Sequence, residues 1–288
     1  MKGKNVNRLF ITRFFITRLV SLFALAALQI VFNVSSAAES VASPEAISSL
    51  APTGLLRAAI NLGNGVLAQR DAVSGELSGV SVVLARELGA RLDVPVELIT
   101  YLSAGMVFDA IDGDEWDIAF LAIEPEREEK VRFSQPYVYI DGTYLVRMDS
   151  SFGSIGDLDR DGVTIAVGRG AAYDLFLSRT LTKATLLRMP TSAAAIEQFT
   201  SGGADAAAGV RQALDDTARA SSKLRVLQDR FMQIGQAIGV PDTRAPAGST
   251  FISRFVEEMK IEGQVRAALD ASGQEGAVVP PPGKPPIF

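Results

Sequence analysis

The chain has 288 residues, with 28 basic and 33 acidic side chains and a formal net charge of −5. It contains neither cysteine nor histidine. The composition therefore excludes disulfides, thiol catalysis, a Ser-His-Asp triad and histidine ligation of zinc. It also excludes a lipidated cysteine, so we do not expect a lipoprotein. The acidic balance argues against nucleic acid as a partner, because phosphate binding needs a basic face.

The first 38 residues have the pattern of an export signal. Basic residues precede a mostly apolar run at residues 19–34, which is shorter than the roughly 20 residues of a membrane span. Ser36 and Ala38 supply the small residues of a signal-peptidase site. We expect cleavage after residue 38 and a periplasmic location, with an uncleaved membrane anchor as the alternative. Without this segment the net charge is near −10, because it holds five basic and no acidic residues.

Strands and helices alternate after a small, polar stretch at residues 39–52, which we interpret as a flexible leader. In the first part of the chain, the apolar pattern predicts strands at 55–60, 94–101, 117–122 and 144–148, and helices at 79–92 and 104–111. In the second part it predicts strands at 163–167, 185–188, 204–208, 224–227 and 234–240, and helices at 171–181, 191–199, 211–220 and 249–271. We expect the last helix to be interrupted near Gly263, and the Pro-rich tail at 276–288 to be disordered. This alternation predicts an α/β fold with parallel-rich sheets covered by helices.

The most informative motif spans residues 123–137 and reads Ile-Glu-Pro-Glu-Arg-Glu-Glu-Lys-Val-Arg-Phe-Ser-Gln-Pro-Tyr. It resembles the signature of the bacterial extracellular solute-binding proteins of family 3, the amino-acid-binding type that serves ABC importers. In that family Thr-Pro-Glu-Arg is followed by a few polar residues and then by Phe-Ser-x-Pro-Tyr. The resemblance covers nearly all of residues 53–272.

The resemblance implies a two-lobed, type II periplasmic-binding-protein fold, with a cleft between two parallel-rich sheets. The first lobe would comprise residues 53–140 and 233–275, and the second lobe residues 141–232. The chain would cross between the lobes near residues 141–143 and 228–232. Ligand would lie in the cleft, and the lobes would close over it.

The resemblance also assigns the central binding residue, Arg127. The arginine of the family motif pairs with the ligand's carboxylate, for which a guanidinium offers a planar, bidentate fork. Arg127 follows a strand, at the edge where open α/β sheets bind ligands. The alternative is a surface arginine paired with Glu124 or Glu128. Glu124 stands where the family has threonine, and it is either an acid in the cleft or a partner of Arg127.

The chain departs from the family pattern at several positions of the first lobe. The strand before the motif ends at Ala122 without the usual Ser or Thr hydroxyls. Asn61 and Asn64 occupy the stretch where an aromatic usually stacks on the ligand, and they can only hydrogen-bond. A second aromatic position falls near Ala104, which is again small. We still predict that these residues line the ligand site.

Further departures lie in the second lobe. The family's Gly-Thr-Thr becomes Gly170-Ala171-Ala172, where the N–H groups of the helix start still form an anion site. Arg169 adjoins it. Val210 replaces the acidic residue that holds the ligand's ammonium.

Four tyrosines near the predicted cleft and hinge are candidate contacts, with core packing as the alternative for each: Tyr137, Tyr139, Tyr144 and Tyr173.

These departures indicate the ligand class. A buried ammonium without a carboxylate partner is costly, so we expect a small carboxylate that lacks a free α-amine. The first hypothesis is the binding component of an ABC importer, monomeric as the family is, with a membrane permease as its partner. A dehydratase-type enzyme on the same fold, using Glu124 as its acid, and a ligand sensor for a receptor are the alternatives. No cofactor or metal is expected, because the acidic residues at 112–117 do not match the calcium-loop spacing.

Overall fold

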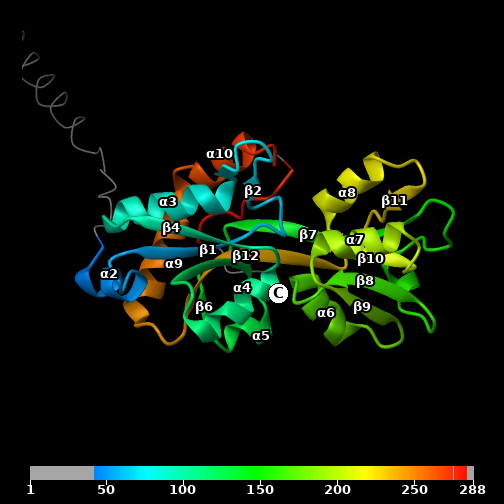
Figure 1. The fold of residues 1–288 in the computed structure, drawn as a ribbon, viewed down its shortest axis with the longest axis horizontal. Coiled ribbons are helices and arrows are strands. Elements are labelled where there is room, and N and C mark those ends of the chain that lie inside the picture. The colour runs from blue at the N-terminus through cyan, green and yellow to red at the C-terminus, as the bar shows by residue number, and fades with distance from the viewer. Residues whose placement is uncertain (1–41, 275, 284–288) are drawn as a thin grey trace, which may run out of the picture. The chain divides into compact units, whose positions relative to one another are not determined.

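Two long strands join the two halves of the sheet. β7 (Val138–Arg147) and β12 (Met232–Pro241) run antiparallel, with Ile140 opposite Ile234 and Gly142 opposite Met232. Beyond this shared segment each strand continues into a different half, as Figure 1 shows. The structure is a computed structural model that describes residues 42–274 and 276–283. The expected signal peptide at residues 1–38 lies outside these described residues.

The first half of the sheet is built around three parallel strands. β1 pairs in parallel with β4 and β5, while β12 runs antiparallel to both β5 and β6. The strands that join β12 in this half are β1 (Leu56–Asn61), β4 (Val96–Tyr101), β5 (Ile118–Ala122) and β6 (Val131–Phe133). A small separate hairpin consists of β2 (Gln69–Arg70) and β3 (Leu77–Ser78).

The second half repeats this arrangement. β8 pairs in parallel with β9 and β10, while β7 runs antiparallel to both β10 and β11. The strands that join β7 are β8 (Thr164–Gly168), β9 (Thr185–Met189), β10 (Ala206–Val210) and β11 (Leu224–Val226). The predicted α/β class is confirmed. The two expected sheets are, however, one mixed sheet, because β7 and β12 pair with each other.

Helices pack on both faces of the sheet. Neighbouring residues of β8 show why: Ile165 belongs to the same core as Leu177 of α6, whereas Ala166 points to the opposite core with Phe199 of α7. The helices of the first half are α2 (Pro44–Leu50), α3 (Val80–Leu92), α4 (Ala104–Asp109), the 3₁₀ turn η1 (Ala110–Gly113), α5 (Pro125–Glu128), α9 (Pro246–Ile261) and α10 (Gln264–Ala271). Those of the second half are the 3₁₀ turn η2 (Ile155–Leu158), α6 (Ala172–Thr180), α7 (Ser192–Thr200) and α8 (Arg211–Arg219).

Local sequence signals explain several element boundaries. The Thr191 hydroxyl accepts a hydrogen bond from the Ala194 N–H at 3.1 Å and caps α7, as predicted. Ser103 caps α4 in the same way. Gly263 has φ of 74° and separates α9 from α10, which confirms the predicted interruption, since a left-handed backbone favours glycine.

Two predicted flexible segments are wrong for the residues that the structure describes. Residues 44–50, expected within a loose leader, form α2, whose Leu50 is fully buried and which packs on α9. The tail also folds back in part, because Ala277 is buried and Val278 bridges to Tyr139. Residues 284–288 lie outside the described part. The apolar residues Leu50 and Ala277 find their partners far away in the sequence, so a local reading misses them.

Within the described ranges, no helix combines the length and the apolarity that crossing a membrane requires. The exact limits of the two lobes stay a prediction.

Candidate functional site

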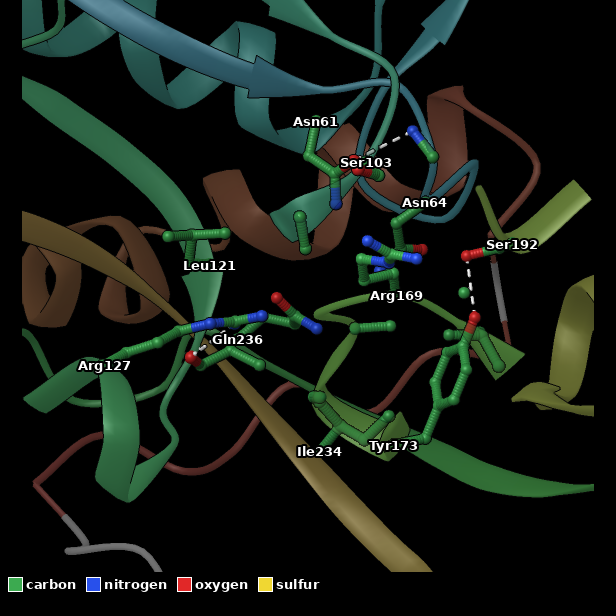
Figure 2. Close-up of a pocket in the computed structure, with 17 residues that line it drawn as sticks. Asn61, Asn64, Ser103, Leu121, Arg127, Arg169, Tyr173, Ser192, Ile234 and Gln236 are labelled. Carbon is green, nitrogen blue, oxygen red and sulfur yellow. Dashed lines mark hydrogen bonds between the residues drawn. The ribbon is translucent and has the colours of Figure 1, made fainter. Parts of the chain in front are cut away.

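A small cavity of about 40 Å³ lies where the carboxyl ends of the parallel strands from both halves meet (Figure 2). The cavity is small because the halves approach each other closely beside it, at Gly105 and Gly170. The lining residues are Asn61, Gly63, Asn64, Ser103, Ala104, Leu121, Ala122, Arg127, Gly168, Arg169, Ala171, Ala172, Tyr173, Ser192, Val210, Ile234 and Gln236. The cleft is therefore lined by residues at the ends of β1, β5, β8 and β10, together with residues of β12.

Arg127 connects the two halves at the bottom of this cavity. Its side chain is buried, and it sits in the short helix α5 that follows β5. Nη1 donates to the Ala122 carbonyl at 2.9 Å, and Nη2 donates to the Gly170 carbonyl of the other half at 2.8 Å. Nε is buried and has no hydrogen-bond partner among the described residues. Burial lowers the pKa of Arg127 to about 10, which still leaves the guanidinium charged at neutral pH.

The loop that presents the Gly170 carbonyl is held by the buried Asp174, which forms an ion pair with the partly exposed Arg188. The Gly170 N–H donates to the Asp174 carboxylate at 2.9 Å, and Arg188 Nε donates to the same carboxylate at 2.9 Å. Gly170 has φ of 68°, in the left-handed region. The Asp174 carboxylate thus occupies part of the anion site that we predicted at the start of α6. Ala171 and Ala172 still line the cavity.

The two halves touch backbone against backbone beside Arg127. A Cβ atom added to Gly170 would lie 2.8 Å from the Gly105 Cα, and one added to Gly105 would lie 2.8 Å from the Arg169 carbonyl oxygen. Neither distance is tolerated between real atoms. The family has an aromatic residue near this position. The small residues Ala104 and Gly105 of this chain therefore allow the closed arrangement of the cleft.

Asn61 and Asn64 both line the cavity, as predicted. The Asn61 Oδ1 accepts from the Gly63 N–H at 2.9 Å, and the Asn64 Oδ1 accepts from the Val66 N–H at 3.2 Å. Each oxygen therefore stabilises its own turn. Figure 2 shows Asn61 pointing into the cavity, which leaves its amide nitrogen as a donor towards a ligand.

The charged side chains that line the cavity are both cationic. They belong to Arg127 and Arg169, and no acidic side chain lines the cavity among the described residues. Arg169 is exposed and makes no ion pair within the described ranges. Val210 lines the cavity at the end of β10, where the family resemblance placed an acidic residue.

Two predicted site residues lie elsewhere. Glu124 is buried outside the cavity, and its carboxylate accepts from Arg179 Nη2 of the other half at 2.6 Å. Glu124 therefore does not line the cavity as a cleft acid. Its hydrogen bond goes to Arg179 and not to Arg127, so its predicted pairing with Arg127 is limited to the attraction between the two charges. Burial raises the pKa of Glu124, and the Arg179 guanidinium partly offsets this rise. The partner lies 55 residues away in the sequence, which is why the motif did not reveal it.

Tyr137 is a core residue. It is fully buried, packs edge to face on Phe120 and places its hydroxyl 3.4 Å from that of Ser81. Burial raises the pKa of its hydroxyl well above the usual value. Its prediction as a cleft aromatic is wrong, because the Pro-Tyr end of the motif turns into β7 and the core.

Tyr173 lines the cavity as predicted. It contacts Ser192, a lining residue that was not predicted from the sequence. Its hydroxyl donates to the Ser192 Oγ at 2.7 Å, and burial raises the pKa of Tyr173 to about 12. Gln236 is a second missed residue; it is buried on β12, directly opposite Ala122 in the sheet. The only sequence signal for Gln236 was a polar residue inside an otherwise apolar strand.

A comparison of the whole sequence with models of protein families shows the family of this chain. The family model of the bacterial extracellular solute-binding proteins, family 3, matches residues 69–271. The chain belongs to this family. The predicted resemblance is thus confirmed for this solute-binding protein.

Individual relatives agree with the family. The glutamine-binding protein of Geobacillus stearothermophilus is 23% identical over 250 residues, which cover 83% of this chain and 94% of that protein. The cyclohexadienyl dehydratase of Pseudomonas aeruginosa is 28% identical over 136 residues, or 46% of this chain; this chain spans only 50% of that enzyme's length.

A solved structure supports the fold. The crystal structure of a mutant of ArgBP from T. maritima superposes with a TM-score of 0.69 at 22% identity, covering 80% of this chain and 100% of that one. The two-lobed fold of the periplasmic amino-acid-binding proteins is therefore confirmed.

Proposed function

We propose that this solute-binding protein is the periplasmic binding component of an ABC importer and captures a small carboxylate by closure of its cleft. One observation carries the proposal: the buried cation Arg127 spans both halves at the bottom of the cleft. When the halves separate, the Gly170 carbonyl leaves Arg127. A ligand carboxylate then replaces this carbonyl and forms a stronger, charge-assisted hydrogen bond.

The composition of the cavity supports a ligand without a free α-amine. The cavity is lined by two arginines and by no acidic residue of the described part, and the family resemblance aligns Val210 at or near the position of the family's acidic residue. An ammonium buried beside Val210 would lose its hydration without gaining a partner. A carboxylate, in contrast, gains Arg127 and the amide donor of Asn61.

The surroundings of Glu124 favour binding over catalysis. A dehydratase is among the relatives, and Glu124 was the acid that such a reaction would use. Its carboxylate is held by Arg179, and Glu124 does not line the cavity. We therefore assign no catalytic role to the cleft.

The partners follow from the proposed role. The N-terminal export pattern fits a periplasmic protein that acts as a monomer and delivers its ligand to a membrane permease. Closure would present both lobes to the permease together. A ligand-sensing role uses the same closure, and deletion of a neighbouring permease gene separates the two, since only import would be lost.

A thermal-shift screen tests the proposal. The panel comprises amino acids, their deaminated and N-blocked analogues, and small mono- and dicarboxylates. A ligand at one hundred times its Kd stabilises the folded state by about 2.7 kcal/mol, or roughly 5–10 °C for a chain of this size. We expect a hit among the carboxylates that is lost in Arg127→Ala and kept in Arg132→Ala, whose side chain is exposed on β6. Equal hits in both variants would contradict the proposal.

A further inference from the structure

A second chamber adjoins the cavity on the side of the second half. Its volume is about 190 Å³, well above that of the cavity. The chamber and the cavity share part of their lining, namely Gly63, Asn64, Tyr173, Ser192 and Val210. A ligand with its carboxylate on Arg127 therefore has space to extend past Val210 into this chamber.

Helix α8 contributes two hydrogen-bond acceptors to the chamber. Gln212 and Asp216 are four residues apart, so they lie on the same face of the helix, and both line the chamber. The Gln212 Oε1 is buried and accepts no hydrogen bond from the described residues. A buried acceptor without a donor is costly, so a rotation of the Gln212 side chain that turns this oxygen to a ligand N–H group in the chamber would be favourable.

Asp216 is available to a ligand. It pairs with Arg219, three residues further along α8, and about 70% of each side chain is exposed. Such solvated pairs contribute little to stability. Asp216 can therefore exchange Arg219 for a ligand cation without a large loss.

The charges of the two spaces are opposite. The cavity is lined by Arg127 and Arg169 with no acidic side chain, whereas the chamber is lined by Asp216 with no basic side chain of the described part. Val210 lines both the positively charged cavity and the negatively charged chamber. A ligand that matches this pattern carries a negative group at one end and a positive group at the other.

We propose that the ligand is an ω-amino carboxylate, with its carboxylate on Arg127 and its ammonium between Gln212 and Asp216. This inference rests on the proposed function. An α-amino acid fits less well, because its ammonium would face Val210 while the acceptors lie in the first turns of α8. In this proposal the acceptors for the amine lie on α8, whereas the family resemblance places an acidic acceptor at the end of β10.

Titration calorimetry on the protein tests this inference. The ligands are the ω-amino carboxylates from β-alanine to 6-aminohexanoate, the straight-chain carboxylates of the same lengths without an amine, and the α-amino isomers. We expect one of the longer ω-amino carboxylates to bind more tightly than both of its matched analogues. Asp216→Asn should reduce this preference roughly 2- to 5-fold, as for a solvated ion pair. It should change the affinity of the amine-free analogue by less than about twofold.

Two controls make the result specific. Asp215→Asn alters the neighbouring carboxylate on α8, which does not line the chamber, and should leave the preference unchanged. Gln212→Leu should reduce it. Equal or tighter binding of amine-free carboxylates that depends on Arg127 would overturn the inference and leave the proposed function intact. Tighter binding of the α-amino isomers, or a preference unaffected by Asp216→Asn, would overturn the inference as well. No binding of any carboxylate would contradict both.

Discussion

Arg127 Nη2 lies 2.8 Å from the Gly170 carbonyl oxygen, and this hydrogen bond joins the two halves of the protein at the bottom of the cleft. The donor is a buried cation and the acceptor is a neutral carbonyl. A hydrogen bond to a carboxylate is stronger than one to a carbonyl. The Ala122 carbonyl of the same half holds Arg127 in place before a ligand arrives, and a ligand carboxylate improves on the Gly170 contact that it replaces.

The geometry of the guanidinium is expected to matter, beyond its charge. Arg127→Lys keeps a cation but cannot donate to Ala122 and to a second acceptor through a planar fork. We expect the affinity for the carboxylate ligand to fall at least about 30-fold, because truncating a buried, hydrogen-bonded charge typically costs 2 kcal/mol or more. Titration calorimetry measures this, with circular dichroism to confirm folding. A lysine variant that binds within about threefold of the wild type would refute the role of the fork.

A methyl group at Gly105 should separate closure from folding. Gly105 lies in α4, where alanine is preferred over glycine by about 0.5–1 kcal/mol. The same Cβ would lie 2.8 Å from the Arg169 carbonyl oxygen when the cleft is closed. We expect Gly105→Ala to melt no lower than the wild type but to bind the ligand at least about tenfold more weakly.

Small-angle X-ray scattering checks the cause of this loss. The wild type should contract when ligand is added, and Gly105→Ala should contract less. Gly156→Ala is the matched control, because a Cβ at Gly156 has no atom within 4 Å. Full contraction of the Gly105 variant would show that closure does not require this backbone contact.

The pair of Glu124 and Arg179 should make stability depend on pH in a defined direction. Burial raises the folded-state pKa of Glu124, so the folded protein binds this proton more tightly than the unfolded chain. The resulting stabilisation is complete below the unfolded pKa, ordinarily near 4.3, and is lost as the pH rises through the folded pKa. The free energy of unfolding of the wild type, relative to Glu124→Gln, should therefore fall as the pH rises above about 4.3. Urea unfolding at several pH values measures it, and a rise over this range would contradict the burial argument.

The hydroxyl of Tyr173 should contribute modestly to the cleft wall. Tyr173→Phe removes its 2.7 Å hydrogen bond to Ser192 while keeping the buried ring. We expect the free energy of unfolding to drop by about 0.5–1.5 kcal/mol. The second variant, Ser192→Ala, removes the acceptor, and the double variant should cost less than the sum of the two if the groups act as a pair. Additive costs would show that the bond carries no coupling energy.

The sequence predicted those parts of the fold that depend on local signals. The cap of α7 by Thr191, the break at Gly263 and the strands around the motif all follow from residues within one or two turns of each other. Arg127 could be placed in the cleft because the motif fixes it at the end of a buried strand. Asn61, at the end of β1, was predicted because the family resemblance aligns its stretch with an aromatic that stacks on the ligand.

The features of the site that were not predicted from the sequence depend on contacts between distant segments. Arg179 reaches Glu124 from the other half, and Gln236 enters the cavity because β12 lies beside β5. The polar chamber beside α8 was not predicted, because the sequence pattern indicated only a helix at residues 211–220. Such pairings are set by the register of the sheet and the closure of the cleft, which no single segment encodes.

A crystal structure of the protein with the carboxylate found by titration tests the central claim most directly. The account predicts a ligand carboxylate oxygen within hydrogen-bonding distance of Arg127 Nη2, in place of the Gly170 carbonyl, and no acidic side chain beside the carbon that bears the carboxylate. A ligand that binds away from Arg127, or an α-ammonium held by a carboxylate next to Val210, would contradict it.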